Sequence, residues 1–245
     1  MTGQVGEIDA VTLDFYNTLV YHQQGIGRGA MLMQYLLEQG LESDPWEHQV
    51  LYDVFEHHGK EYAPDLSDAA REQYLVRFTE RLFVRLNVRL RHGTAMDHAA
   101  AVWEVLGPGS LGVFPDVIPL LHTIRAAGYP TALVSNWQCG LSHFCVELGL
   151  ADAFDHIVVS AEVGSQKPDP EIFRIACRRL GVSPERTLHV GDTVVDDVQG
   201  ARNASMPVVL LLRDGTAIDV DTPVIAGLDE LPGLLGVDRA AGRDD

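Results

Sequence analysis

Cysteine and long hydrophobic runs are both scarce in this chain of 245 residues. Its three cysteines, Cys139, Cys145 and Cys177, form no Cys-x-x-Cys motif, so neither a disulfide framework nor a zinc knuckle is indicated. The longest aliphatic run, residues 208–212, is far too short for a helix that spans a bilayer. Residues 1–10 lack the basic and apolar regions of a signal peptide. We therefore expect a cytoplasmic protein that has no membrane partner.

Basic residues are few relative to acidic ones. Lysine and arginine total 18 against 35 aspartates and glutamates, which gives a formal net charge of −17 with histidine neutral. A chain this acidic repels phosphate backbones and anionic lipid surfaces, so we expect no nucleic-acid partner. The hydrophobic fraction of 46% and the charged fraction of 22% are ordinary for a globular protein. They exclude collagen-like, coiled-coil and wholly disordered chains.

Short apolar runs alternate with amphipathic ones in the second half of the chain. Strands are predicted at residues 10–13, 131–134, 157–159, 187–190 and 208–212. Helices are predicted at residues 115–127, 139–148, 169–180 and 196–204, and each of them precedes one of the last four strands. Strands separated by helices of this length pair in parallel through right-handed crossovers. The prediction is therefore an α/β fold with a doubly wound parallel sheet.

The long stretch between the first and second strands has helical patterns only. One helix is predicted at residues 31–37, and three more begin at Asp44-Pro45-Trp46, at Ser67 and at Thr94. This stretch reads as an all-helical insertion into the α/β core. The predicted domains are residues 1–20 and 108–237 for the core, 21–107 for the insertion and 238–245 for a polar tail.

Polar side chains follow the predicted strands at the edge where parallel sheets bind ligands. They are Asp14 and Thr18, Ser135 and Asn136, Lys167, and then Asp192, Asp196 and Asp197. Taken singly, each has an ordinary explanation as a turn residue, a helix cap or a surface charge. Together they direct a nucleophile, a hydroxyl, a cation and an acidic cluster to one edge, which predicts an active site.

Four segments carry a resemblance to a known family. They are Leu13-Asp14-Phe15-Tyr16-Asn17-Thr18-Leu19, Val134-Ser135-Asn136, Lys167-Pro168-Asp169-Pro170, and Val190-Gly191-Asp192 with the residues that follow to Asp197. In this order they resemble the four motifs of the haloacid dehalogenase superfamily of hydrolases, of the C1-capped subfamily I type. The resemblance implies a Rossmann-like core. It also implies that the helical insertion is a cap that closes over the site and selects the substrate.

The resemblance also implies a role for each residue of the site. Asp14 is then the nucleophile that forms a covalent aspartyl intermediate. Ser135 and Lys167 hold the anionic oxygens of the substrate. From their place after the strands we also expect Thr18 and Asn136 to bind substrate, and Trp137, which follows Asn136, either lines the site or packs under it. The implied Mg²⁺ ligands are Asp14, the backbone carbonyl of Tyr16, Asp192, and Asp196 or Asp197. The spacing leaves open which of these last two faces the metal.

Two motifs favour different reactions. The family's phosphatases usually carry an aspartate as general acid where this chain has Tyr16, and Asp-x-Tyr-x-Thr is the pattern of its 2-haloacid dehalogenases, whose halide leaving group needs no proton. The carboxylates around Asp192 instead favour a metal site, because clustered acids repel one another unless a dication lies among them. The tyrosine is either a catalytic group or a ring that only packs.

We predict a hydrolase, and specifically a Mg²⁺-dependent phosphatase of a small phosphorylated metabolite. One alternative is a metal-independent 2-haloacid dehalogenase. The other is a protein of the same fold that binds a phosphorylated ligand with little or no turnover, because Tyr16 replaces the acid.

Overall fold

The computed structural model describes residues 6–23, 25, 27–47, 50–51, 53–54, 68–137 and 140–237. The chain divides into two compact units. Unit 1 contains Met1–Val20, Val113–Asn136 and Asp152–Asp245, and unit 2 contains Tyr21–Gly112 and Trp137–Ala151. The predicted helix start at Ser67 and the predicted polar tail lie outside the described residues. None of the helices in the described ranges is long and apolar enough to cross a membrane.

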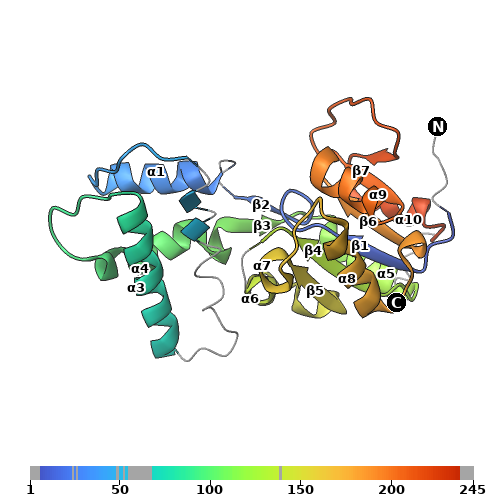
Figure 1. Cartoon of the computed structure of the whole chain (residues 1–245), viewed down its shortest axis with the longest axis horizontal. Helices are drawn as coiled ribbons and strands as arrows, with labels where there is room; N and C mark the ends of the chain where they lie inside the picture. Colours follow the sequence, from blue (N-terminus) through green and yellow to red (C-terminus); the bar gives the residue numbers. More distant parts are fainter. Residues whose placement is uncertain are drawn as a thin grey trace, which may run out of the picture. The chain divides into compact units, whose positions relative to one another are not determined.

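Unit 1 is built on a six-stranded sheet in which every strand pairs in parallel with its neighbours (Figure 1). The strands in chain order are β1 Ala10–Leu13, β4 Thr131–Ser135, β5 His156–Val159, β6 Thr187–Gly191, β7 Val208–Leu211 and β8 Val224–Ile225. Their order across the sheet is β5-β4-β1-β6-β7-β8. The chain runs outward on one side of β1 and then crosses to the other, which confirms the predicted doubly wound sheet.

The helices of unit 1 follow the predicted alternation. They are α5 Val117–Ala126, α7 Ser160–Val163, α8 Pro170–Leu180, α9 Gly200–Asn203 and α10 Leu231–Leu234, with short 3₁₀ turns η2 Ala151–Ala153, η3 Pro184–Arg186 and η5 Leu228–Glu230. Helix α8 begins and ends at residues whose types predict helix ends. The Asp169 side chain accepts a hydrogen bond from Glu171 N, and the helix ends at Gly181 with φ +69°.

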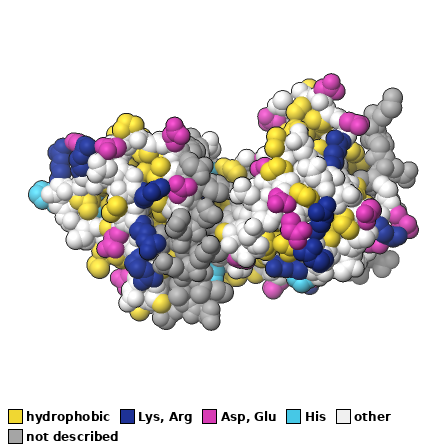
Figure 2. All heavy atoms as spheres, viewed as in Figure 1, with side chains coloured by type: hydrophobic (Ala, Val, Ile, Leu, Met, Phe, Trp, Pro, Cys, Tyr) yellow, Lys and Arg dark blue, Asp and Glu magenta, His cyan; other side chains and the backbone are white. Residues whose placement is uncertain are grey.

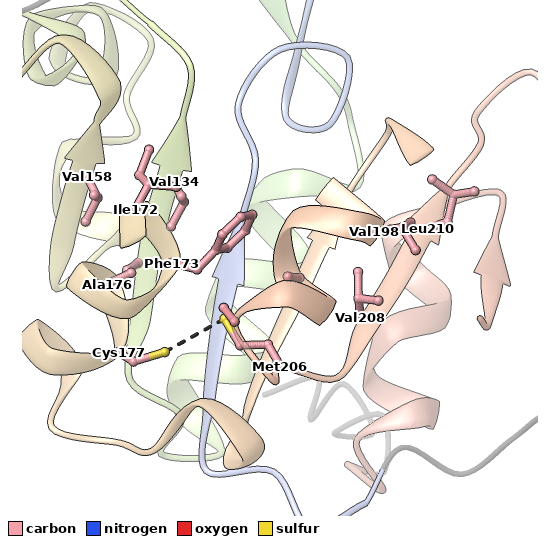
Figure 3. Close-up of a cluster of buried hydrophobic side chains, with 13 residues drawn as sticks. Val134, Val158, Ile172, Phe173, Ala176, Cys177, Val198, Met206, Val208 and Leu210 are labelled. Carbon is pink, nitrogen blue, oxygen red and sulfur yellow. Dashed lines mark hydrogen bonds between the residues drawn. The ribbon is translucent and has the colours of Figure 1, made fainter. Parts of the chain in front are cut away.

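The core of unit 1 is an apolar cluster between the sheet and its helices. Figure 3 shows Phe173 of α8 at the centre of this cluster, between Val134 of the sheet and Met206. Phe173 is fully buried, and its ring lies edge-on to His189 of β6 with centroids 4.9 Å apart. This packing fixes α8 against the sheet, and with it the loop that precedes α8.

Unit 2 is mainly helical. Its helices are α1 Arg28–Glu38, α3 Asp68–Arg85, α4 Ala95–Leu106 and α6 Leu141–Glu147, and the turn η1 Pro108–Ser110 follows α4. Trp103 of α4 packs edge-on against Tyr74 and Phe78 of α3, with centroids 5.8 Å apart in both pairs. The strands β2 Val20–His22 and β3 Leu111–Val113 form a separate two-stranded sheet where the chain enters and leaves this unit.

Unit 2 also contains a segment that the predicted domains assigned to the core. Residues Trp137–Ala151 group with it because Phe144 of α6 packs against Trp103 and Trp137, with ring centroids 6.1 and 5.8 Å apart. The predicted boundaries otherwise remain a prediction.

Two predicted helix starts are wrong. Asp44-Pro45-Trp46 is not helical, and helical residues appear from Val50 onward in the described part of this region. Instead of capping a helix, the Asp44 carboxylate accepts hydrogen bonds from Asn87 Nδ2 and Arg89 at 2.9 and 2.8 Å. The helix predicted at residues 196–204 begins earlier, as a π-helical segment η4 Val194–Gln199 that continues into α9.

Candidate active site

Asp14 stands where β1 ends, between two neighbouring strands. Its backbone N–H donates to the carbonyl of Val190 in β6 at 2.9 Å, and Leu13 is in register with both Leu133 of β4 and Val190. The residue is only 6% exposed. Asp14 therefore lies at the point where the strand order reverses, which is where sheets of this kind bind ligands.

Lys167 binds Asp14 directly. Its Nζ donates to Asp14 Oδ1 at 2.5 Å and to Asp197 Oδ1 at 2.6 Å. Asn136 holds the backbone of this lysine from both sides, since Lys167 N donates to Asn136 Oδ1 at 2.7 Å and Asn136 Nδ2 donates to the Lys167 carbonyl at 2.9 Å. Asn136 therefore fixes the loop that carries the cation, a contact that the expected substrate-binding role did not include.

Three of the predicted acids come together. One carboxylate oxygen each from Asp14, Asp192 and Asp197 lies within 4.8 Å of the others. Asp192 is half-buried, and the side chain of Asn17, a residue with the left-handed φ of 60°, acts to lower its pKa. Asp196 is not a member of this group. Asp197 thus lies inside the cluster and Asp196 outside it, and which of the two faces a metal ion stays a prediction.

Asp197 is the most completely bonded of these acids. Its Oδ1 accepts from Lys167 Nζ and from His189 Nε2 at 3.0 Å, and its Oδ2 accepts from Thr193 N at 2.9 Å and Thr193 Oγ1 at 2.7 Å. Gly191 makes this approach possible, because a Cβ at that position would lie 2.2 Å from Asp197 Cγ. The glycine of the fourth motif is therefore required for space.

The cluster has more negative than positive charge, because three carboxylates surround one ammonium group. Burial, with Asp197 and Asp192 nearby, raises the pKa of Asp14 to about 6 although Lys167 opposes the shift. Burial and Asp197 likewise raise the pKa of Asp192 to about 6. Burial alone would lower the pKa of Lys167, but Asp14 and Asp197 outweigh it and raise that pKa. Although burial opposes it, Lys167 and His189 hold the pKa of Asp197 well below its usual range.

The remaining predicted residues are placed as follows. Ser135 ends β4 and is 2% exposed, and Tyr16 is half-buried and forms an isolated bridge with Val20. The Oγ1 of Thr18 is buried and has no hydrogen-bond partner within the described part of the chain. Trp137 belongs to unit 2, where the Arg28 guanidinium lies 4.2 Å from its ring centroid. The structure therefore groups Trp137 with Arg28 and the helical unit.

Sequence reasoning missed several residues that support the site. Thr12, His189 and Thr193 bind the clustered acids or their partners, and Asn17 acts on the pKa of Asp192. The available signal was the polar character of Thr12 and His189 within fully buried strands. Their pairing depends on the register between β1 and β6, which the sequence pattern does not specify.

Arg213 was missed as well. It donates to both carboxylate oxygens of Asp116 at 2.9 and 3.0 Å and to the Thr18 carbonyl at 2.7 Å. Its guanidinium also lies 3.7 Å from the ring centroid of Phe114. Arg213 therefore anchors the loop that follows Asp14.

The chain belongs to the haloacid dehalogenase-like hydrolase family, whose model matches residues 8–205, and it is therefore a hydrolase. It is 30% identical over 212 residues to the glyceraldehyde 3-phosphate phosphatase of Methanopyrus kandleri, with 84% of each chain covered. Its structure is similar to that of a phosphatase of this family from Thermococcus onnurineus, with a TM-score of 0.62, 25% identity, and 95% and 100% of the two chains covered. It is also similar to a 2-haloacid dehalogenase from Pseudomonas syringae, with a TM-score of 0.61, 27% identity, and 94% and 98% covered.

Proposed function

We propose that this hydrolase is a Mg²⁺-dependent phosphatase that acts on a small phosphorylated metabolite through Asp14. The observation that carries the proposal is the cluster of Asp14, Asp192 and Asp197 around a single ammonium group, Lys167. Three carboxylates and one cation leave a net negative charge in a buried place, which a dication would offset. The relationship to the Methanopyrus kandleri phosphatase supports the same conclusion.

The donor set fits Mg²⁺. The proposed ligands are carboxylate oxygens of Asp14 and Asp192 and the backbone carbonyl oxygen of Tyr16, and oxygen-only sets completed by water are typical of this ion. Burial and the neighbouring acids raise the pKa of Asp14 and of Asp192, so both charged carboxylates are costly without a counterion. When bound, Mg²⁺ supplies positive charge that lets a phosphate dianion approach a carboxylate.

Asp14 then performs the chemistry. One of its carboxylate oxygens attacks phosphorus, the bond from phosphorus to the ester oxygen breaks, and the leaving oxygen departs with the bonding electron pair. Lys167 and Ser135 bind the phosphoryl oxygens during this step. Water next attacks the phosphorus of the aspartyl phosphate, which releases inorganic phosphate and restores the Asp14 carboxylate. Because Tyr16 stands where the family's phosphatases carry an acid, substrates with good leaving groups are favoured.

A 2-haloacid dehalogenase is the second candidate, favoured by the Asp-x-Tyr-x-Thr pattern around Tyr16. In that reaction Asp14 attacks carbon and halide leaves without a proton or a metal. The candidate offers no use for the Asp192 carboxylate beside Asp14, and we rank it lower for that reason.

The test is a screen of wild-type protein against phosphate monoesters, including glyceraldehyde 3-phosphate, in Mg²⁺ and in EDTA. We expect phosphate release that requires Mg²⁺ and is abolished by Asp14→Asn, with circular dichroism showing that the variant is folded. Chloride release from 2-chloropropionate in EDTA would instead establish the dehalogenase. Mg²⁺ binding with no turnover of any monoester would indicate the non-catalytic binding protein.

A further inference from the structure

The hydrogen bonds of Asp197 occupy both of its oxygens completely. An ionised carboxylate offers about four lone-pair positions. Lys167 Nζ and His189 Nε2 take the two on Oδ1, and the N–H and Oγ1 of Thr193 take the two on Oδ2. A metal ion can bind Asp197 only if one of these donors is displaced, whereas the described residues do not bond Asp14 or Asp192 on every side in this way.

His189 is the donor that sequence motifs did not reveal. It is completely buried in β6, and both of its ring nitrogens have partners. Nε2 lies 3.0 Å from Asp197 Oδ1, and Nδ1 lies 2.9 Å from Thr12 Oγ1. Because an ionised carboxylate can only accept, the proton of this pair resides on Nε2 and points to Asp197. The Phe173 ring packs edge-on against the imidazole, which limits its rotation.

The register between β1 and β6 places His189 beside Thr12, close to the end of β1 where Asp14 lies. Thr12 of β1 is paired with His189 of β6, and Thr12 precedes Asp14 by two residues, so that side chains at these two positions share one face of the strand. A continuous set of polar contacts thus runs from Thr12 through His189, Asp197 and Lys167 to Asp14. Every side chain in this series is nine-tenths buried or more.

We propose that His189 is a positioning residue for the proposed phosphatase reaction. It holds Asp197 as the partner of Lys167 and keeps that carboxylate from ligating the metal. With Asp197 fixed, the Lys167 ammonium stays hydrogen-bonded to both Asp197 and Asp14. In this position it can bind the phosphoryl oxygens. The inference rests on the proposed function for its kinetic consequence, but the bond from His189 to Asp197 in the metal-bound protein can be tested without turnover.

The kinetic test compares His189→Leu with His189→Gln. Leucine fills similar space without a donor, whereas glutamine carries an amide N–H in place of Nε2–H. Loss of a hydrogen-bond partner behind a metal site typically costs about 10- to 100-fold in metal affinity or activity, and we expect His189→Leu to lower kcat in a similar range while KM changes little. His189→Gln should restore most of the rate. His156→Leu, a histidine in β5 outside this network, is the matched control and should keep the wild-type kcat.

The spectroscopic test uses isotope-labelled wild-type protein. The Nε2 proton of a buried imidazole bonded to a carboxylate gives a slowly exchanging, downfield resonance, which His189→Leu identifies by its absence. We expect this resonance in metal-free protein and its persistence at saturating Mg²⁺. Loss of the resonance on Mg²⁺ addition would show that Asp197 turns to the metal and would overturn the proposal.

The kinetic outcomes are equally decisive. A folded His189→Leu variant with the kcat of wild type would contradict the positioning role, as would a folded His189→Gln variant that is no better than leucine. A wild-type protein that hydrolyses no monoester refutes the proposed function, and the resonance still decides whether His189 holds Asp197. If His189→Leu does not fold, Thr12→Val weakens the same series from its far end and is expected to lower kcat with KM unchanged.

Discussion

Asp196 and Asp197 are adjacent in sequence but have different surroundings. Asp197 is 1% exposed and pairs with Lys167 and His189. Asp196 lies outside the acidic cluster and is half-exposed. An exposed carboxylate can lose its charge at little cost, whereas removal of one partner from a buried ion pair leaves the other charge uncompensated.

We therefore predict that two matched amide substitutions change the free energy of unfolding by very different amounts. Asp197→Asn should reduce the free energy of unfolding by about 3–5 kcal/mol, the usual cost of breaking a buried pair. Asp196→Asn should change it by less than about 0.5 kcal/mol, as is typical of surface positions. Urea denaturation of both variants measures this. Equal losses in the two variants would show that the position of Asp197 in the cluster is not what stabilises the fold.

In the proposed phosphatase, Tyr16 in place of an acid should make the rate depend on the leaving group. If no side chain protonates the leaving oxygen, aryl phosphates whose phenols have rising pKa should give a strongly negative Brønsted slope. Tyr16→Asp supplies a general acid, a contribution typically worth about 10²- to 10⁴-fold, and should flatten the slope by accelerating poor leaving groups most. A wild-type slope near zero would show that another group donates the proton.

At the scale of secondary structure, Arg213 joins parts of unit 1 that are distant in sequence. It follows β7 and binds Asp116 before α5, 97 residues away, while also holding the Thr18 carbonyl in the loop after Asp14. Leu228 N donates to the same Asp116 carboxylate at 2.8 Å. The paired side chains are 18% exposed, so that solvent competes only weakly for these bonds.

Replacement of this arginine should cost more than replacement of an exposed one. Arg213→Lys keeps the charge but loses the two-pronged geometry, and we expect a loss of about 1–3 kcal/mol in the free energy of unfolding. Arg178→Lys is the control, because the pair of Arg178 with Glu171 is 61% and 46% exposed, and it should change stability by less than about 1 kcal/mol. Comparable losses would mean that the Arg213 contacts add nothing beyond a surface pair.

Local signals predicted those elements whose ends are set by nearby residues. Asp169, Pro170 and Gly181 mark α8 in the sequence and mark it in the structure. The Asp44 signal failed because its carboxylate is engaged by Asn87 and Arg89, a contact between distant residues. The roles of His189 and Arg213 depend on strand register and on pairs far apart in the chain, which no local pattern reports. The positions of Asp14 and Asp192 at one edge of the sheet were predictable because each directly follows a strand.

Over the whole molecule, the exposed and the buried charges have different surroundings. The exposed basic groups are largely balanced by neighbours such as Glu42 and Asp44 around Arg89 or Asp9 beside Arg186, and on the face shown in Figure 2 basic and acidic side chains lie interspersed. The buried acids of the site are not balanced in this way. Their pKa values of about 6 make metal-free stability depend on pH.

The sign of that dependence follows from linkage. A carboxyl whose folded-state pKa is raised binds its proton more tightly when folded, so its contribution to stability is full below about pH 4 and is lost as the pH rises through about 6. We predict that metal-free wild type becomes less stable than Asp192→Asn as the pH rises from 4 to about 7. Mg²⁺ should raise the melting temperature of wild type more at pH 7 than at pH 5 and should not stabilise Asp192→Asn. Parallel pH profiles for the two proteins would refute this.

We have proposed that Asp14 and its acidic neighbours form a metal-dependent phosphatase site. This proposal is tested most directly by titrating Mg²⁺ into EDTA-treated wild-type protein and measuring phosphate release from an aryl phosphate, with chloride release from 2-chloropropionate measured in parallel. We expect phosphate release that rises from near zero to saturation as Mg²⁺ is added, and we expect no release of chloride. Chloride release in EDTA without phosphate release would contradict it.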